Sequence, residues 1–108
     1  MSAPIAFAKT VTVDGDDVDV VAMDLGGQGP VRLFVTNSGG AALSAGKVQL
    51  AASVDGPWED LDTSTFGTLG SGVTKSLVIA KPVGAIRFLA SCASSTTLDA
   101  QCLSGLQD

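Results

Sequence analysis

The stretch Val54-Asp55-Gly56-Pro57-Trp58-Glu59-Asp60-Leu61 decides the fold, because it contains the end of one strand, a tight turn and a short aromatic strand. Asp-Gly is typical of turns that reverse the chain between antiparallel strands. Further along, Ile86-Arg87-Phe88-Leu89-Ala90 places apolar residues at every second position. Together the two stretches predict a small antiparallel β-sandwich, with Trp58 plugging one end of its core.

Turn residues recur along the whole chain at the spacing that separates short strands. Between them we predict strands near residues 5–13, 17–25, 31–36, 47–54, 57–61, 73–79, 85–92 and 97–103. A length of 108 residues suits one domain with a single two-layer core. We therefore expect residues 1–108 to form one all-β domain, a sandwich of about seven or eight strands with an immunoglobulin-like or jelly-roll-like order.

Residues 1–8 have two interpretations. They form a first strand, or they form an extended arm that pairs with a neighbouring subunit through backbone hydrogen bonds. No basic segment precedes an apolar stretch here, and no apolar run approaches the length of a membrane helix. We expect a soluble protein that is not secreted and does not contact a membrane.

The charge of the chain argues against nucleic acid as a partner. Eleven acidic residues against six basic ones give a net charge of −5, which repels phosphate backbones. Charged residues make up only 16% of the chain and apolar residues 45%, whereas about 25% charged residues is usual. Part of the surface is therefore a candidate for burial against other subunits.

Several apolar residues fall on the strand face where polar residues are expected. A bulge that re-aims the side chains is one interpretation, and a subunit interface is the other. The predicted interface residues are Val21, Met23, Phe34, Val78 and Leu89, together with Ile5 and Phe7 near the amino terminus.

The chain contains no histidine and no tyrosine, which excludes histidine-based nucleophile pairs and most catalytic zinc sites. Glu59, Asp60 and Asp62 are the nearest carboxylate cluster for glycoside hydrolysis. Adjacent residues of a strand point to opposite faces, and a deep aromatic pocket is lacking around this cluster. We expect no enzymatic activity and name no catalytic residue.

Asp14-Gly15-Asp16-Asp17, followed by Asp19, supplies closely spaced carboxylates of the kind that hard cations prefer. The spacing does not fit a helix-loop-helix calcium site, and an Asp-rich hairpin turn explains the pattern. We predict no bound metal and no cofactor.

Cys92 and Cys102 are the only cysteines, and both share the parity of core residues. A hairpin centred on Thr97 would place them opposite one another and permit a disulfide. Buried free thiols are the favoured alternative. The predicted structural core includes Trp58, Phe88, Cys92 and Cys102; as an alternative, the indole of Trp58 is a platform on which a sugar ring stacks.

Two motifs carry a resemblance to a known family. Val48-Gln49-Leu50-x-x-Ser53-x-Asp55-Gly56-x-Trp58-x-x-Leu61, followed by Ala85-Ile86-Arg87-Phe88-x-Ala90, resembles small β-sandwich proteins of tailed-bacteriophage virions. Those proteins occur as capsid decoration (cement) proteins and as accessory modules of tails and fibres. The resemblance covers about residues 30–100 and carries over no catalytic residue.

The resemblance implies a capsid decoration protein that binds the major capsid protein or other virion proteins and stabilises the assembled head. It would be made in the host cytoplasm, sit on the head surface of the virion and self-associate, with a trimer favoured. Two alternatives remain: a tail or baseplate accessory subunit of the same fold, and a carbohydrate-binding module.

Overall fold

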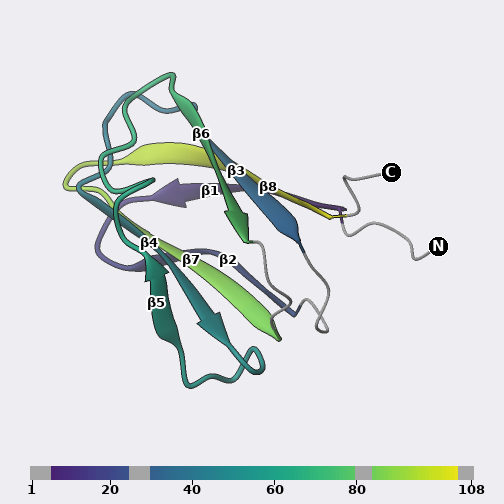
Figure 1. Ribbon diagram of the computed structural model, residues 1–108. Helices are drawn as coiled ribbons and strands as arrows, with labels where there is room; N and C mark the ends of the chain where they lie inside the picture. Colours follow the sequence, from purple (N-terminus) through teal and green to yellow (C-terminus); the bar gives the residue numbers. More distant parts are fainter. Residues whose placement is uncertain (1–5, 25–29, 80–83, 105–108) are drawn as a thin grey trace.

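The computed structural model describes residues 6–24, 30–79 and 84–104, which form two layers of β-strands (Figure 1). The strands are β1 (Ala6–Val13), β2 (Val18–Asp24), β3 (Val31–Asn37), β4 (Ala45–Ala51), β5 (Glu59–Asp62), β6 (Thr74–Ile79), β7 (Ala85–Ser91) and β8 (Thr96–Ser104). These ranges contain no helix that is long and apolar enough to cross a membrane. The predicted all-β class is confirmed, and each predicted strand overlaps one observed strand.

The strands pair as one long hairpin folded over on itself. β1 pairs with β8, β2 with β7, β3 with β6 and β4 with β5, always antiparallel. Pairing of β3 with β8 and of β4 with β7 completes a first sheet, β1-β8-β3-β6, and a second sheet, β2-β7-β4-β5. This is the order of a jelly roll, whereas an immunoglobulin sandwich keeps its first two strands in one sheet.

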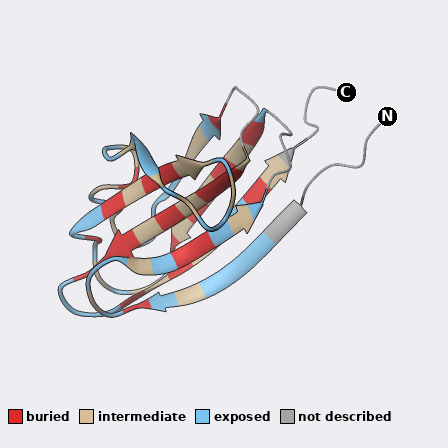
Figure 2. Ribbon diagram, turned by 90° about the horizontal axis from the view of Figure 1, so that it is seen from below, coloured by how far each residue is buried: buried red, intermediate tan, exposed pale blue. Residues whose placement is uncertain are grey.

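The core lies between the two sheets and is built from the period-two pattern of the strands. β3 buries every second residue, and Figure 2 shows buried residues alternating with more exposed ones along several strands. Leu33 from β3, Leu98 from β8 and Ile86 from β7 have no exposed surface. Aliphatic side chains therefore supply most of the buried area, as the low aromatic content of the chain requires.

Phe66, in the connection between β5 and β6, supplies the second aromatic ring of the core. It has no exposed surface, and its ring centroid lies 5.1 Å from that of Phe88, which is also fully buried. Phe88 therefore lies in the core. The prediction for Trp58 is wrong: this residue is half-buried and lies over Arg87, an outward residue of β7. Phe66, and not Trp58, is the ring that packs against Phe88.

The assignment of Val21 to an interface is also wrong. The pairing of β2 with β7 shifts register between Asp19 and Val21, and both Val20 and Val21 have no exposed surface. The bulge re-aims Val21 into the core, which was the alternative interpretation of its parity. Met23 faces the same side and packs, partly buried, against the core.

Cys92 and Cys102 are not hairpin partners, because β7 and β8 belong to different sheets. Both are buried free thiols, as the favoured alternative stated. Desolvation by burial raises the pKa of the Cys102 thiol to about 11. Their role is that of small core residues.

The end of β4 and the start of β1 differ from the predicted strand boundaries. β4 ends at Ala51 instead of continuing to residue 54, so Val54 is 44% exposed. Residues 6–8 belong to β1, and Phe7 lies opposite Cys102 in its register with β8. Ile5 lies outside the described residues.

Candidate functional site

On the outer face of the first sheet, a group of apolar side chains is surrounded by threonine and serine side chains. Arg32 of β3 lies between Val78 of β6 and Leu103 of β8 in the register, and its guanidinium is 5.9 Å from the ring centroid of Phe34. Val78 is 45% exposed, and Phe34 is half-buried. We call these four residues, Arg32, Phe34, Val78 and Leu103, the Phe34 face.

The surroundings of the Phe34 face are almost uncharged. Among the described residues at outward positions of the first sheet, Arg32 and Asp99 are the only charged ones. Asp99 accepts a hydrogen bond of 2.7 Å from the hydroxyl of Thr10, and the hydroxyls of Thr36 and Thr74 lie 2.7 Å apart. A face without net charge stands out in a chain of net charge −5.

The outer face of the second sheet holds a different arrangement, built around Trp58. The guanidinium of Arg87 lies 4.5 Å from the centroid of the Trp58 ring, in a cation–π contact. Arg87 donates from Nε to Oε1 of Gln49 at 2.9 Å and from Nη2 to the same oxygen. Gln49 in turn donates from Nε2 to Oδ1 of Asp60 at 2.8 Å. We call these four residues the Trp58 cluster.

The register explains why the Trp58 cluster forms. Gln49 of β4 lies opposite Arg87 of β7 on one side and opposite Asp60 of β5 on the other. Three polar residues on adjacent strands therefore form one row across the outer face. Gln49 is only 8% exposed, and both ends of its amide have partners, so its burial leaves no polar atom unsatisfied.

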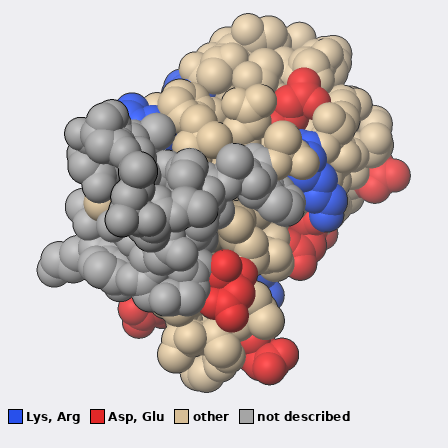
Figure 3. All heavy atoms as spheres, turned by 90° about the vertical axis from the view of Figure 1, so that its right-hand side faces the viewer, with Lys and Arg blue, Asp and Glu red and all other residues tan. Residues whose placement is uncertain are grey.

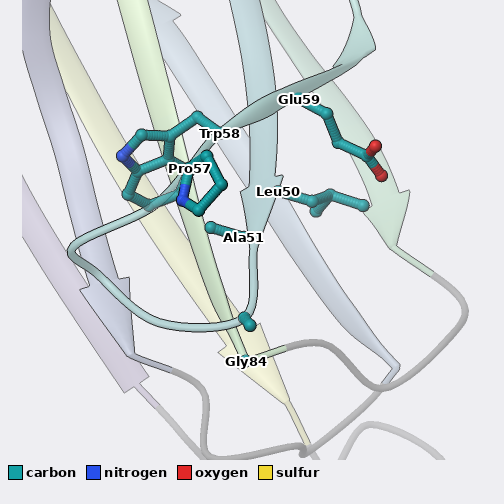
Figure 4. Close-up of a pocket in the computed structure, with 7 residues that line it drawn as sticks. Leu50, Ala51, Pro57, Trp58, Glu59 and Gly84 are labelled. Carbon is teal, nitrogen blue, oxygen red and sulfur yellow. The ribbon is translucent and has the colours of Figure 1, made fainter.

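A groove with a volume of about 440 Å³ runs beside the indole, at the end of the β4–β5 hairpin (Figure 4). It is lined by Leu50, Ala51, Ala52, Pro57, Trp58, Glu59 and Gly84. Gly84 packs on the backbone of Ala52 so closely that a Cβ there would lie 1.9 Å from the Ala52 carbonyl oxygen. Glycine is therefore required where the start of β7 meets the end of β4.

The turn before Trp58 also depends on glycine. Gly56 has a φ of +77°, and its N–H donates to the carbonyl of Ser53 at 3.0 Å. A Cβ on Gly56 would lie 3.0 Å from Cδ1 of Trp58. The Asp-Gly turn predicted from the sequence thus also seats the edge of the indole.

The remaining interface prediction, Leu89, lies on the outer face of the second sheet. It is opposite Asp19 of β2 and Lys47 of β4. With Ser91 and others it lines a small hollow of about 130 Å³. Of the interface residues named from the sequence, Phe34, Val78 and Leu89 hold outward positions, on two opposite faces of the molecule.

The acidic residues weighed for catalysis hold structural positions. Asp60 belongs to the Trp58 cluster, whereas Asp62 accepts hydrogen bonds from the backbone N–H groups of Ser64 and Thr65 and from the Thr65 hydroxyl. Burial acts to raise the pKa of Asp62, but these hydrogen bonds outweigh it and hold the pKa below its ordinary value. Glu59 is exposed on the rim of the groove.

The Asp-rich segment forms the turn between β1 and β2. Asp17 has a φ of +50°, its N–H donates to Oγ of Ser91 at 2.8 Å, and the Gly15 carbonyl accepts from Cys92. Within the described ranges no group of three or more metal-ligating side chains gathers in one place. Figure 3 shows acidic side chains at several separate places on one face, with no extended basic stripe among the atoms that are not grey.

Comparison with known proteins shows the fold and no family. No protein-family model matches the sequence, and no curated protein matches it. PirA has a TM-score of 0.62 and 17% identity over 86% of this chain and 90% of PirA. The SPBc2 prophage-derived protein YomS has a TM-score of 0.59 and 12% identity over 96% and 97% of the two chains. Chitosan-binding module 1 of a Paenibacillus sp. IK-5 chitosanase/glucanase has a TM-score of 0.52 and 16% identity, over 89% of this chain and 74% of the module's chain.

Sequence reasoning named Trp58 but missed the partners that position it. Gln49 stands between apolar Val48 and Leu50, and Arg87 stands between apolar Ile86 and Phe88. Aligning the apolar positions of the strands around them, Val48 with Phe88, would have placed the two polar residues side by side. The sequence did not show that β4 and β7 are neighbouring strands, so this alignment could not be made.

Proposed function

We propose that this chain is a non-enzymatic structural protein of a tailed-bacteriophage virion, a decoration protein that binds the major capsid protein on the surface of the assembled head. The observation that carries the proposal is the Phe34 face, where Phe34 and Val78 lie beside Arg32 on a sheet surface without net charge, in an acidic chain. Exposed apolar patches rimmed by polar residues mark protein interaction sites.

The fold supports this role. YomS, a prophage-derived protein, aligns over 97% of its own length, so it and this chain share the fold and are of comparable size. Such a domain needs no active site to stabilise a shell. Each bound copy adds interface free energy that exists only in the assembled particle.

Phe34→Asp tests the proposed face, with Leu89→Asp as its matched control on the opposite sheet. Both residues are half-buried and outward, so both variants should fold. We expect Phe34→Asp to lose binding to phage heads by about tenfold or more, because a carboxylate would be desolvated in the interface, whereas Leu89→Asp keeps it. Co-sedimentation with heads that lack the protein measures this; equal binding of both variants would refute the assignment.

Electron microscopy of the particle tests the location. A decoration protein gives density at regular positions on the outer head surface. Density confined to the tail or baseplate would replace the head role by that of an accessory tail subunit. Absence from particles would overturn the virion role altogether.

Self-association belongs to the same proposal, with a trimer as the proposed state. Sedimentation equilibrium of the purified chain should give three times the monomer mass. A single monomeric species at high concentration would contradict the trimer.

A further inference from the structure

We propose that the groove beside Trp58 binds a carbohydrate made of uncharged or amino-bearing pyranose rings. This site lies on the second sheet, away from the Phe34 face, so the proposal goes beyond the virion role and does not depend on it. It rests on the way that the Trp58 cluster holds the indole beside a groove whose lining is mostly apolar and includes Glu59.

The indole is fixed before any ligand arrives. Arg87 stacks on it at 4.5 Å, Gln49 holds Arg87 by two hydrogen bonds, and Asp60 holds Gln49. Gly56 lies against the indole edge. A ring held in this way loses little conformational entropy on binding, which is how preorganised sites gain affinity.

The groove matches the two-sided character of a sugar ring. Pyranose rings present C–H groups on their faces and hydroxyls at their edges. The C–H groups, which carry slight positive charge, are attracted to the negative face of an indole. Leu50 and Pro57 supply further apolar surface, and the volume of about 440 Å³ falls within the range of about 300–1,000 Å³ for small-molecule sites.

Glu59 is the charged residue in the lining of the groove. It is exposed, and its carboxylate has no hydrogen-bond partner among the described residues. Glu59 lies opposite Leu50 in the register, and Figure 4 shows both side chains on the side of β4 away from the indole. An ionised carboxylate only accepts hydrogen bonds, so it pairs with the hydroxyl or ammonium donors of a sugar. Asp60 adds a second negative charge nearby, while Arg87 is already engaged by Trp58 and Gln49. Glu59, Asp60 and Arg87 together carry a charge of −1, which disfavours acidic sugars.

The position of Trp58 is not explained by core packing. Among the residues whose burial the structure describes, Phe66 and Phe88 are the fully buried aromatic rings, and they contact each other. Trp58 instead lies on the outer face, where one side of its ring meets a guanidinium and the groove opens beside it. Large apolar side chains placed at an exposed groove are the usual anchors of ligands.

Tryptophan fluorescence provides a direct readout, because Trp58 is the only tryptophan and the chain has no tyrosine. The purified full chain is titrated with hexasaccharides of β-1,4-linked glucose, glucosamine and N-acetylglucosamine, and with an oligogalacturonate. We expect a saturable change in emission with at least one of the first three and none with the oligogalacturonate. No saturable change with any of the four probes, or a response to the acidic one alone, would overturn the proposal.

Calorimetric titration of variants, with the same sugar, tests the residues. Trp58→Ala should weaken binding by about tenfold or more, and Trp58→Phe by less, because the smaller ring keeps a face for stacking. Phe34→Ala, on the opposite sheet, should bind as tightly as the wild type. Circular dichroism shows which variants are folded; if Trp58→Ala is not, Trp58→Phe carries the test. A folded variant at position 58 with unchanged affinity would refute the site.

Two further variants separate positioning from contact. Arg87→Lys keeps the charge but removes the planar stack, so the emission of Trp58 should shift in the free protein and the affinity should fall. Glu59→Gln should weaken binding of the glucosamine hexamer more than that of the glucose hexamer, because only the former carries ammonium groups. Equal effects on the two sugars would contradict the role of Glu59 in the proposal.

Discussion

Asn37, at the end of β3, is a fully buried polar side chain whose hydrogen-bonding groups are all used. Its Nδ2 donates to the carbonyls of Ala41 and Leu69 at 2.7 and 3.0 Å. Its Oδ1 accepts from the N–H of Gly39 and from the hydroxyl of Thr96. This one residue therefore links β8 to the loops that precede β4 and β6.

We predict that Asn37→Ala lowers the free energy of unfolding by about 3 kcal/mol, because several buried partners lose their hydrogen bonds without gaining water. Chemical denaturation measures the loss. The control is Ser38→Ala, which removes one exposed hydrogen bond of 3.3 Å and should cost less than about 1 kcal/mol. Similar losses in the two variants would show that the buried amide of Asn37 contributes no more to stability than an exposed hydrogen bond does.

Asp62 makes the stability of the fold depend on pH. Hydrogen bonds from Thr65 and Ser64 outweigh desolvation and lower its pKa below the ordinary value of 3.8. The carboxylate therefore stabilises the folded state fully above the unfolded pKa, and this contribution is lost as the pH falls through the folded pKa.

We predict that the wild type is more stable than Asp62→Asn at pH 7 and that the difference shrinks below about pH 4. Urea denaturation of both proteins from pH 7 to pH 2.5 measures this. A difference that stays constant over this range would contradict the predicted ionisation.

At the scale of the element, the two aromatic environments predict different costs of truncation. Phe88→Ala should lower the free energy of unfolding by about 3–5 kcal/mol, because it leaves a cavity beside Phe66. Trp58→Ala should cost only about 1 kcal/mol, mainly the cation–π contact and partial burial. Denaturant midpoints at constant m-value test the order of the two costs. A larger loss for Trp58→Ala than for Phe88→Ala would show that the indole acts as a core residue.

The strands were predictable where the alternation of the chain is regular. In β3, Val31, Leu33 and Val35 are buried and the residues between them are not, as the sequence indicates. In β2 the register shift buries two consecutive valines, and no residue type marks where such a shift occurs.

The pairing of elements was less accessible than their positions. Four residues, 92–95, separate β7 from β8, a length that also suits a hairpin, yet the chain crosses here from one sheet to the other. The Trp58 cluster escaped prediction for the same reason, since it requires β4 to lie between β5 and β7. The alternation of apolar and polar residues shows which face of a strand is buried, but packing between distant parts of the chain determines which strands pair.

At the scale of the whole molecule, the most distant strands in sequence are neighbours in space. β8 lies between β1 and β3 in the first sheet and buries Leu98, Ala100 and Cys102 in the core. The first sheet is therefore incomplete until the last strand is present.

We predict that a chain ending at residue 95 does not fold, because β1 then has no partner in its sheet and the core loses one wall. Amide dispersion in a proton–nitrogen correlation spectrum measures this against the full chain. A dispersed spectrum for the shortened chain would show that the second sheet and its covering strands suffice.

Ala6 pairs with Leu103 across β1 and β8, so the start of β1 and the end of β8 lie on adjacent strands at one end of the sandwich. A short peptide linker would bridge them, and the chain could then be opened at another exposed turn without disturbing either layer. Circularly permuted forms of this domain are thus accessible. In such forms the new termini lie at a chosen turn, and a fused peptide can be attached there.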